Sequence, residues 1–342
     1  MIPRVEQAVA QALTGRGVDR ETAFSLLALS KPWEILALVS AAARVTEAFH
    51  PPQAHLCAIV NAKSGGCPED CRFCAQSAHY NTGVARYGFL DVERVVEAAK
   101  AAERHGAARF CIVTATSRPT ETLLDQAAAA ARRIREETRL GVDCSLGFLT
   151  PSQARRLAQA GVGVYNHNLE TAASHFPRLV TTHRYEDRVA TVRAVKAAGM
   201  MACCGGILGV GETARQRLEL AFALRDLEVD IVPVNILNAR PGTPLAQAPP
   251  LEPLEAVKTI ALFRLILPRA VIKLAGGREK HLRDLQALAV LAGARGAIVG
   301  GYLTTSGREP ELDLRMMADA GCPAAPARGD TPTPAATCQG TS

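Results

Sequence analysis

Short apolar runs alternate with amphipathic segments along most of the chain, beginning near residue 55. The apolar runs have the length of strands. They fall at 55–61, 109–114, 141–146, 163–168, 200–207, 230–237, 270–275 and 297–300. The segments between them carry apolar residues at helical spacing. They predict helices at 92–105, 122–138, 152–160, 185–198, 213–227, 254–267, 280–292 and 310–320.

Eight strands that alternate with helices define an α/β protein and predict a (β/α)8 TIM-type barrel. The roughly 250 residues that they occupy match the usual size of that fold. A doubly wound open sheet shows the same alternation. Its dinucleotide-binding members carry a glycine fingerprint, and the glycine run at 205–212 does not have that spacing. We therefore expect the barrel.

The two ends of the chain differ from the middle. Three helical patterns predict an N-terminal helical cap over residues 1–50. They lie at 6–13, from Asp19 or Arg20 onward, and at 31–48. The barrel is expected over residues 51–322. Residues 323–342 have little apolar bulk and many prolines and alanines, which predicts a disordered C-terminal tail.

Composition narrows the class of partner. The chain has 342 residues, of which 48% are apolar and 21% charged, as in ordinary globular proteins. Its net charge of +6 comes from scattered residues without a block of basic ones, and aromatics are only 4%, so no nucleic-acid partner is expected. The sequence has neither a secretory signal pattern nor an apolar run long enough for a bilayer.

The default location is therefore the cytoplasm, with no membrane contact. Thiols stay reduced there, so ten cysteines indicate metal ligation rather than disulfides.

Three of these cysteines form a compact array. Cys67, Cys71 and Cys74 have C-x3-C-x2-C spacing and no fourth cysteine nearby. This spacing also fits one face of a helix, but Gly65, Gly66 and the proline after Cys67 favour a loop. Clustered thiolates hold iron–sulfur clusters. Three ligands leave one iron open, which indicates chemistry rather than simple electron transfer.

Cysteines also occur on several predicted strands. Cys111 lies on the second strand, Cys144 on the third, and Cys203 with Cys204 on the fifth. A lone strand cysteine usually packs as a small apolar residue. Three on different strands of one barrel can converge in the lumen, which predicts a second thiolate site. Because adjacent strand residues point to opposite faces, only one of Cys203 and Cys204 is expected to take part.

The fourth strand ends in a dense polar motif, Tyr165-Asn-His-Asn-Leu-Glu-Thr171. Asn166, Asn168 and Glu170 stand two residues apart, so an extended chain would put all three side chains on one face. Amide and carboxylate groups suit ribose hydroxyls and a cyclic urea. A solvent-exposed polar strand end is the alternative interpretation.

The cysteine array points to the radical S-adenosylmethionine (SAM) superfamily, and together with the Tyr165–Thr171 motif it closely resembles biotin synthase. The resemblance covers about residues 54–321. It implies the barrel, a [4Fe-4S] cluster on the loop cysteines and SAM at its open iron. It also implies an auxiliary cluster, a [2Fe-2S] cluster or a larger one, and identifies Cys111, Cys144 and Cys203 as its ligands, choosing Cys203 by its distance to the glycine pair.

The resemblance assigns further roles. It places Asn166, Asn168, Glu170, Arg188 and Phe73 at SAM, Asn168 and Asn235 at the ureido ring of dethiobiotin, and Thr304 and Thr305 at the carboxylate tail of that substrate. Glu170 departs from the family, which more often has aspartate. Lys273 stands where many members have an arginine ligand to the auxiliary cluster. We expect it to stay an ammonium group rather than to ligate iron, because ligation requires loss of its proton.

The resemblance implies that a 5′-deoxyadenosyl radical abstracts hydrogen from dethiobiotin and that the auxiliary cluster donates the sulfur of biotin. It also implies a low-potential donor of the flavodoxin or ferredoxin type and a homodimer. Other radical SAM barrels, of the hydrogenase-maturation or methylornithine-synthase type, share the first array but should lack the later motifs. An iron–sulfur electron carrier is disfavoured by the missing fourth ligand, and a zinc module by the missing second Cys/His pair.

Overall fold

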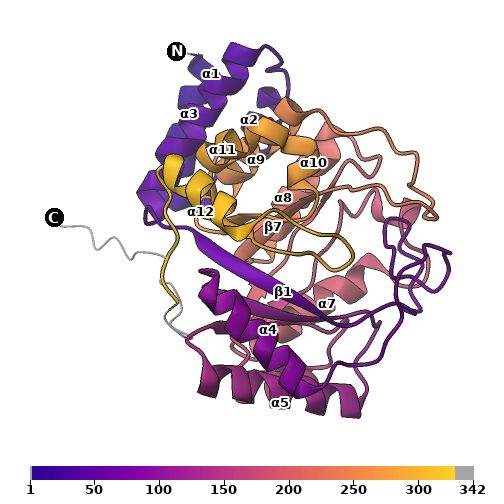
Figure 1. Ribbon diagram of the computed structural model, residues 1–342. Helices are drawn as coiled ribbons and strands as arrows, with labels where there is room; N and C mark the ends of the chain where they lie inside the picture. The colour runs from indigo at the N-terminus through magenta and orange to yellow at the C-terminus, as the bar shows by residue number, and fades with distance from the viewer. Residues whose placement is uncertain (1, 328–342) are drawn as a thin grey trace.

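The computed structural model describes residues 2–327, and its strands form one closed parallel barrel wrapped by helices (Figure 1). The strands are β1 (His55–Lys63), β2 (Arg109–Thr114), β3 (Gly141–Ser145), β4 (Val164–Asn166), β5 (Met201–Cys203), β6 (Gly206–Leu208), β7 (Ile231–Ile236), β8 (Val271–Leu274) and β9 (Ala294–Ile298). They pair in the order β5-β4-β3-β2-β1-β9-β8-β7-β6, and a contact between β5 and β7 closes the ring. The predicted TIM-type barrel is confirmed.

The fifth predicted strand is interrupted in its middle. β5 ends at Cys203 and β6 begins at Gly206, yet both pair with β7 and together make one of the eight positions around the ring. A Cβ atom on Gly205 would lie 2.0 Å from the carbonyl oxygen of Pro233 on β7. Only glycine allows this close approach of the two backbones.

Helices cover the outside of the barrel. They are α4 (Val92–Arg104), α5 (Glu121–Glu137), α6 (Pro151–Gln159), α7 (Tyr185–Ala197), α8 (Ala214–Asp226), α9 (Pro253–Ile266), α10 (Arg278–Leu282), α11 (Gln286–Leu291) and α12 (Pro310–Asp319). α5 shows why they form. Thr120 caps its first turn by accepting from the Leu123 amide at 3.2 Å, and the run of alanines that follows favours helix.

Two further predicted elements are wrong in detail. The single helix expected at 280–292 is α10, a short 3-10 turn (Arg283–Leu285) and α11. The chain breaks there because Arg283 has a φ of 50°, which no helix accommodates. The last strand, expected at 297–300, is β9 and begins three residues earlier, at Ala294.

The N-terminal helices pack together at one end of the barrel beside α9 (Figure 1). They are α1 (Pro3–Gln11), a π-helical turn (Ala12–Arg16), α2 (Arg20–Leu26) and α3 (Pro32–Phe49). The predicted start of α2 is confirmed, since Asp19 accepts from the Thr22 amide at 2.7 Å. α9 is buried from Ala256 to Ile266 because α3 covers its outer side. The domain boundary near residue 50 stays a prediction.

The start of the segment 323–342 is ordered beside β1. The Ala54 amide donates to the Pro323 carbonyl at 2.8 Å, and the Ala325 amide donates to the Ala54 carbonyl at 2.9 Å. Residues 328–342, and with them Cys338, lie outside the described residues.

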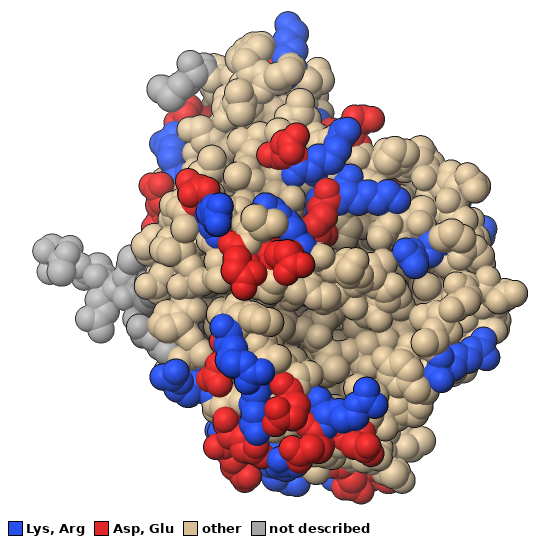
Figure 2. Space-filling model, viewed as in Figure 1, with Lys and Arg blue, Asp and Glu red and all other residues tan. Residues whose placement is uncertain are grey.

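Charged side chains of both signs are interspersed on the face shown in Figure 2, without a large field of one sign. Within residues 2–327, no helix combines the length and the apolar character that crossing a membrane requires.

Candidate active site

The loop after β1 holds Cys67, Cys71 and Cys74. Gly65 and Gly66 both have a φ of 69°, which turns the chain out of the strand. The Cys67 amide donates to the Gln76 carbonyl at 3.0 Å, and the Cys67 carbonyl accepts from the Ala78 amide at 2.7 Å. No helix passes through these residues. The predicted loop is therefore confirmed.

Two acidic residues of this loop fix it to the segment before α7. Asp70 accepts from the backbone amides of Thr181 at 2.9 Å and Thr182 at 3.2 Å. Burial alone would raise the pKa of Asp70, but these hydrogen bonds lower it to about 2. Glu69 contacts His183 Nδ1 at 2.6 Å. The loop is thus held by contacts more than 100 residues away in sequence.

Cys71 belongs to a small apolar cluster with Phe176, Leu179 and Val180, and Cys74 packs against that cluster. Cys71 is 8% exposed, and Cys67 and Cys74 are half-buried. Burial raises the pKa of all three thiols, that of Cys74 to about 11. Without bound metal the loop therefore holds neutral thiols at pH 7, and a metal must displace their protons.

Among the described residues, no group of three or more His, Cys, Asp or Glu side chains is spaced to hold a single metal ion. An iron–sulfur cluster spreads its ligands over several iron atoms and suits thiols that do not meet at one point.

Arg188, at the start of α7, joins the loop to the end of β4. Its Nη2 lies 3.8 Å from Cys71 Sγ, and its Nη1 donates to the Asn168 carbonyl at 2.9 Å and to Glu170 Oε1 at 3.3 Å. Burial raises the pKa of Glu170 although Arg188 opposes the shift. Glu170 has a φ of 70°, an uncommon backbone conformation for a residue other than glycine.

The expectation that Asn166, Asn168 and Glu170 share one face is correct only for the first two. β4 ends at Asn166, and both asparagines line a cavity of about 280 Å³ inside the barrel. The left-handed backbone at Glu170 turns its side chain away from that cavity and toward Arg188. The motif therefore contributes side chains to two sites. Asn166 and Asn168 line the lumen cavity, and Glu170 contacts Arg188 beside the thiol loop.

The lumen cavity brings together many of the predicted residues. Its lining includes Cys57, Cys111, Asn166, Asn168, Cys203, Asn235, Lys273 and Thr304. Cys111 and Cys203 are 2% and 1% exposed, and Asn166 Nδ2 donates to Cys111 Sγ at 3.0 Å. Cys204 points to the opposite face and belongs to the main hydrophobic core. Cys203 therefore faces the lumen and Cys204 does not.

Cys144 is not brought to the lumen. It is fully buried in the main core, on the same side of the sheet as its neighbour Ile112 on β2. The lumen-facing neighbour on β3 is Asp143, which sits opposite Cys111 and pairs with Arg109 Nε at 2.7 Å. The structure therefore separates Cys144 from Cys111 and Cys203, unlike the sequence-based expectation.

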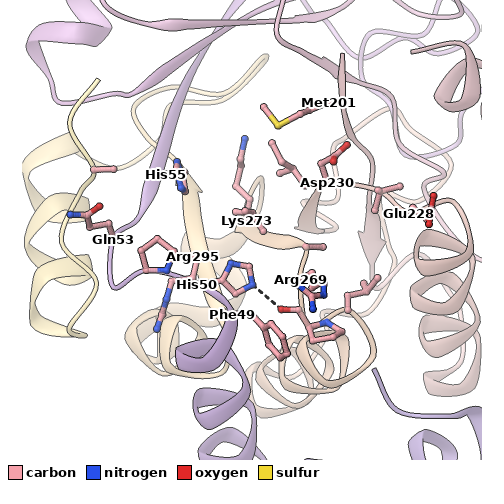
Figure 3. Close-up of a pocket in the computed structure, with 18 of the residues that line it drawn as sticks. Phe49, His50, Gln53, His55, Met201, Glu228, Asp230, Arg269, Lys273 and Arg295 are labelled. Atoms are coloured by element: carbon pink, nitrogen blue, oxygen red, sulfur yellow. Dashed lines mark hydrogen bonds between the residues drawn. The ribbon is translucent and has the colours of Figure 1, made fainter. Parts of the chain in front are cut away.

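Lys273 points from β8 into the barrel interior, between His55 on one side and Asp230 and Met201 on the other (Figure 3). It is 3% exposed and forms no hydrogen bond or ion pair with any residue in the described part of the chain. Burial by itself disfavours its charged form, but Cys57, Cys203 and Asp143 reverse the effect and raise its pKa. These three neighbours thus favour the charged form of Lys273.

Two family models match the chain, the Radical SAM superfamily over residues 62–224 and the Biotin and Thiamin Synthesis associated domain over residues 233–323. A biotin synthase from Heliobacterium modesticaldum is 49% identical over 317 residues, which cover 93% of this chain and 97% of that protein. A biotin synthase from Geobacter sulfurreducens is 48% identical over 324 residues, covering 94% and 98%. The chain belongs to the biotin synthase family. It is therefore a radical SAM enzyme, and membership implies a [4Fe-4S] cluster and SAM.

Solved structures share the fold at lower identity. A methylornithine synthase superposes with a TM-score of 0.81 at 19% identity, covering 93% of this chain and 97% of that chain. The FeFe-hydrogenase maturase HydG from Carboxydothermus hydrogenoformans gives a TM-score of 0.78 at 19%, covering 93% and 78%. These likenesses concern the fold alone, whereas the biotin synthases match over nearly the whole sequence.

For a member of the biotin synthase family, the expected substrate residues divide between two cavities. Asn235 and Thr304 line the lumen cavity. Asn235 already donates to the Gly206 carbonyl at 3.2 Å and accepts from the Gly276 amide at 3.0 Å. Thr305 lines a neighbouring surface pocket instead, and Phe73 packs in the apolar cluster of the thiol loop.

Several residues of the candidate site carry no expectation from the sequence. They are Glu69, Asp70 and His183, which fix the loop, and Cys57, Arg109 and Asp143 in the lumen. Cys57 could have been found, because it lies two and four residues before Ile59 and Asn61 on one predicted strand and alternation puts it on their face. Glu69 and Asp70 pair with a segment beyond residue 180, and no local sequence pattern predicts that pairing.

A second and larger cavity, of about 720 Å³, lies at the amino ends of the strands. Figure 3 shows His55, Asp230 and Met201 around it, and Arg269 and Arg295 also belong to its lining. Cys57 and Lys273 line both cavities. These two side chains therefore mark the level at which the lumen is divided.

Proposed function

We propose that this chain inserts sulfur into dethiobiotin and so forms biotin, using SAM as its radical source. The family assignment supports this reaction, and one observation ties the parts of the site together. The Asn168 carbonyl accepts from Arg188, which lies beside Cys71, while Asn168 itself lines the cavity that holds Cys111 and Cys203. A single residue thus links the loop thiols to the lumen thiols.

The donor set of the loop fits the cofactors. Cys67, Cys71 and Cys74 offer three thiolates and leave a fourth position for SAM. Bound together, the cluster and SAM supply the radical that breaks an unactivated C–H bond, which no acid or base of the chain can do at neutral pH. The burial of this site beside apolar side chains supports exclusion of water from such a radical.

Arg188 is proposed to hold the SAM carboxylate with its planar fork, since its Nη2 already faces the cluster loop. Asn166, Asn168 and Glu170 are proposed to hold the ribose hydroxyls, and Phe73 to pack against the adenine. The Glu170 carboxyl group lies 3.3 Å from Arg188 Nη1, which supports a position beside SAM for both side chains.

The substrate is proposed to lie in the lumen cavity. Asn168 and Asn235 would bind the ureido ring, and Thr304 with Thr305 would bind the carboxylate tail. Ile59, Val113 and Pro233 line the same cavity and suit an aliphatic chain. Because Asn235 already bonds to β6 and to Gly276, its orientation is fixed before the substrate arrives.

An auxiliary iron–sulfur cluster in the lumen, [2Fe-2S] or larger, is the proposed sulfur source. Cys111, Cys203 and the unpartnered ammonium group of Lys273 support a cluster at this level. Cys144 remains a ligand only by resemblance. The family resemblance supports two further proposals, a low-potential electron donor of the flavodoxin or ferredoxin type and a homodimer. The many free thiols support a cytoplasmic location.

The test is product analysis with protein purified and reconstituted without oxygen. Incubation with SAM, dithionite and dethiobiotin should give 5′-deoxyadenosine and biotin by mass spectrometry. A variant with Cys67, Cys71 and Cys74 all changed to Ala is the matched control and should give neither. Formation of 5′-deoxyadenosine without any biotin would contradict the proposed substrate, and its formation by the triple variant would contradict the cofactor site.

A further inference from the structure

The lumen contains a thiol for which the proposed function has no use. Cys57 lies on β1, is 3% exposed and lines both cavities of the barrel. Around the closed ring, β1 and β5 are four strand positions apart in either direction, so Cys57 and Cys203 face each other across the lumen. Cys111 stands on β2, next to β1. Three thiols from three strands thus point into one cavity.

The strand that should supply the third ligand supplies a carboxylate instead. On β3 the lumen position opposite Cys111 is Asp143, and Cys144 is packed behind the sheet with 0% exposure. Asp143 is engaged by Arg109 Nε at 2.7 Å and lies 3.7 Å from Cys57 Sγ. To reach the lumen, Cys144 would need a one-residue shift of β3, which would also turn Asp143 into the core.

Lys273 gives independent evidence that an anionic group belongs at this level. A buried ammonium without a hydrogen-bond acceptor is costly, and the described residues provide it with none. Its electrostatic neighbours are Cys57, Cys203 and Asp143, which favour its charge, and Arg109, which opposes it. A cluster held by thiolates on Cys57 and Cys203 would place negative charge next to the ammonium.

We propose that Cys57, together with Cys111 and Cys203, binds the auxiliary iron–sulfur cluster, that Cys144 does not, and that Lys273 faces this cluster as an ammonium group. This assignment rests on the proposed function but concerns the ligand set alone. Each thiol releases one proton when its sulfur bonds to iron.

The experiment isolates the auxiliary cluster in the full-length chain. The variant with Cys67, Cys71 and Cys74 changed to Ala is reconstituted with iron and sulfide, so that the iron it retains belongs to the lumen. Cys57→Ala and Cys144→Ala are then added separately, with Cys204→Ala as a matched buried thiol outside the cavity. Iron, acid-labile sulfide and the Mössbauer spectrum are measured for each variant.

We expect Cys57→Ala to lose most of the lumen iron and sulfide, and Cys144→Ala and Cys204→Ala to keep both. If Cys57→Ala retains all of the lumen iron, the proposal is wrong. The role of Cys57 would then be limited to its hydrogen bond to Asp143. Loss of lumen iron in Cys144→Ala with an unchanged unfolding midpoint would also overturn the proposal. If Cys57→Ala fails to fold, the Mössbauer spectrum of Cys57→Ser tests the proposal instead. A serine ligand must change the Mössbauer parameters of the lumen cluster. An unchanged spectrum would count against the proposal.

These outcomes are separable from failure of the proposed function. Iron in the lumen is measured without SAM, dethiobiotin or turnover. A chain that binds lumen iron through Cys57 but makes no biotin would retain the ligand assignment and lose the reaction.

Discussion

The two thiol sites of this chain are built in opposite ways. The loop site collects Cys67, Cys71 and Cys74 from one short stretch, and two of these side chains are half-buried. The lumen site collects its thiols from strands that lie far apart in sequence, and each of them is at most 3% exposed. Local sequence defines the first site, and strand register defines the second.

This difference has energetic consequences. The loop is attached through surface-near hydrogen bonds of Glu69 and Asp70, so its ligands can change while the barrel stays intact. The lumen thiols share a low-dielectric interior with Lys273 and with the Arg109–Asp143 pair. A change there alters both the chemistry and the balance of buried charge.

The largest expected effect is at the loop. Cys71→Ala should reduce 5′-deoxyadenosine formation to background and with it biotin, because the cluster loses a ligand beside Arg188. The unfolding midpoint of the apoprotein should hardly change, since Cys71 belongs to a small apolar cluster apart from the main core. Product analysis and thermal unfolding measure the two effects.

Cys322→Ala is the control for this variant, because Cys322 is a fully buried thiol in the main core. It should keep both products. A Cys71→Ala protein that still cleaves SAM would show that the loop is not the radical site.

The second largest effect distinguishes the adjacent residues Cys203 and Cys204. Cys203→Ser should keep reductive SAM cleavage but lose biotin formation, because Cys203 lines the lumen. Cys204→Ser should keep most biotin formation and lose about 1–2 kcal/mol of stability, since its hydroxyl would be buried in an apolar core. Both products and urea unfolding are measured for each variant. Equal loss of biotin in both would mean that β5 does not present only Cys203 to the lumen.

The same contrast explains which features the sequence predicted. The sequence predicts the loop array because the spacing of Cys67, Cys71 and Cys74 does not depend on strand register. The barrel was found because eight alternating elements have few other solutions. Arg188 was assigned by resemblance, and the structure places it beside Cys71.

The features that were missed depend on register or on distant pairing. Cys144 and Asp143 are adjacent, and a shift of one residue exchanges the face on which each lies. The break at Cys204–Gly205 depends on how closely β7 approaches. The turn at Glu170 depends on a backbone conformation that no periodicity reveals. Local patterns contain none of this information.

A smaller effect tests the buried ammonium of the lumen. Lys273→Met should stabilise the apoprotein by about 1–3 kcal/mol, because an unpartnered buried charge is replaced by an apolar side chain of similar length. Biotin formation should fall by about 10- to 100-fold, as for other groups that support a metal site. Urea unfolding of the apoprotein and biotin assays measure the two changes.

Lys258→Met is the matched comparison, since Lys258 is 5% exposed but donates to the Leu27 carbonyl at 2.9 Å. It should be destabilising, because it leaves a partner unsatisfied. Full biotin turnover by Lys273→Met would show that neither ligation nor charge at Lys273 matters.

The smallest effect concerns the attachment of the loop. Asp70→Asn should weaken the hydrogen bonds to the Thr181 and Thr182 amides by about 1 kcal/mol, after allowance for solvent screening. These amides should then exchange with deuterium roughly fivefold faster in the apoprotein, while β-strand amides stay unchanged. The pKa of Asp70 lies at about 2, below its usual 3.8. Its contribution is therefore complete above about pH 4 and disappears as the pH falls through 2. The difference between wild type and Asp70→Asn at equal pH should vanish in the same range, and a constant difference would mean that the charge of Asp70 does not hold the loop.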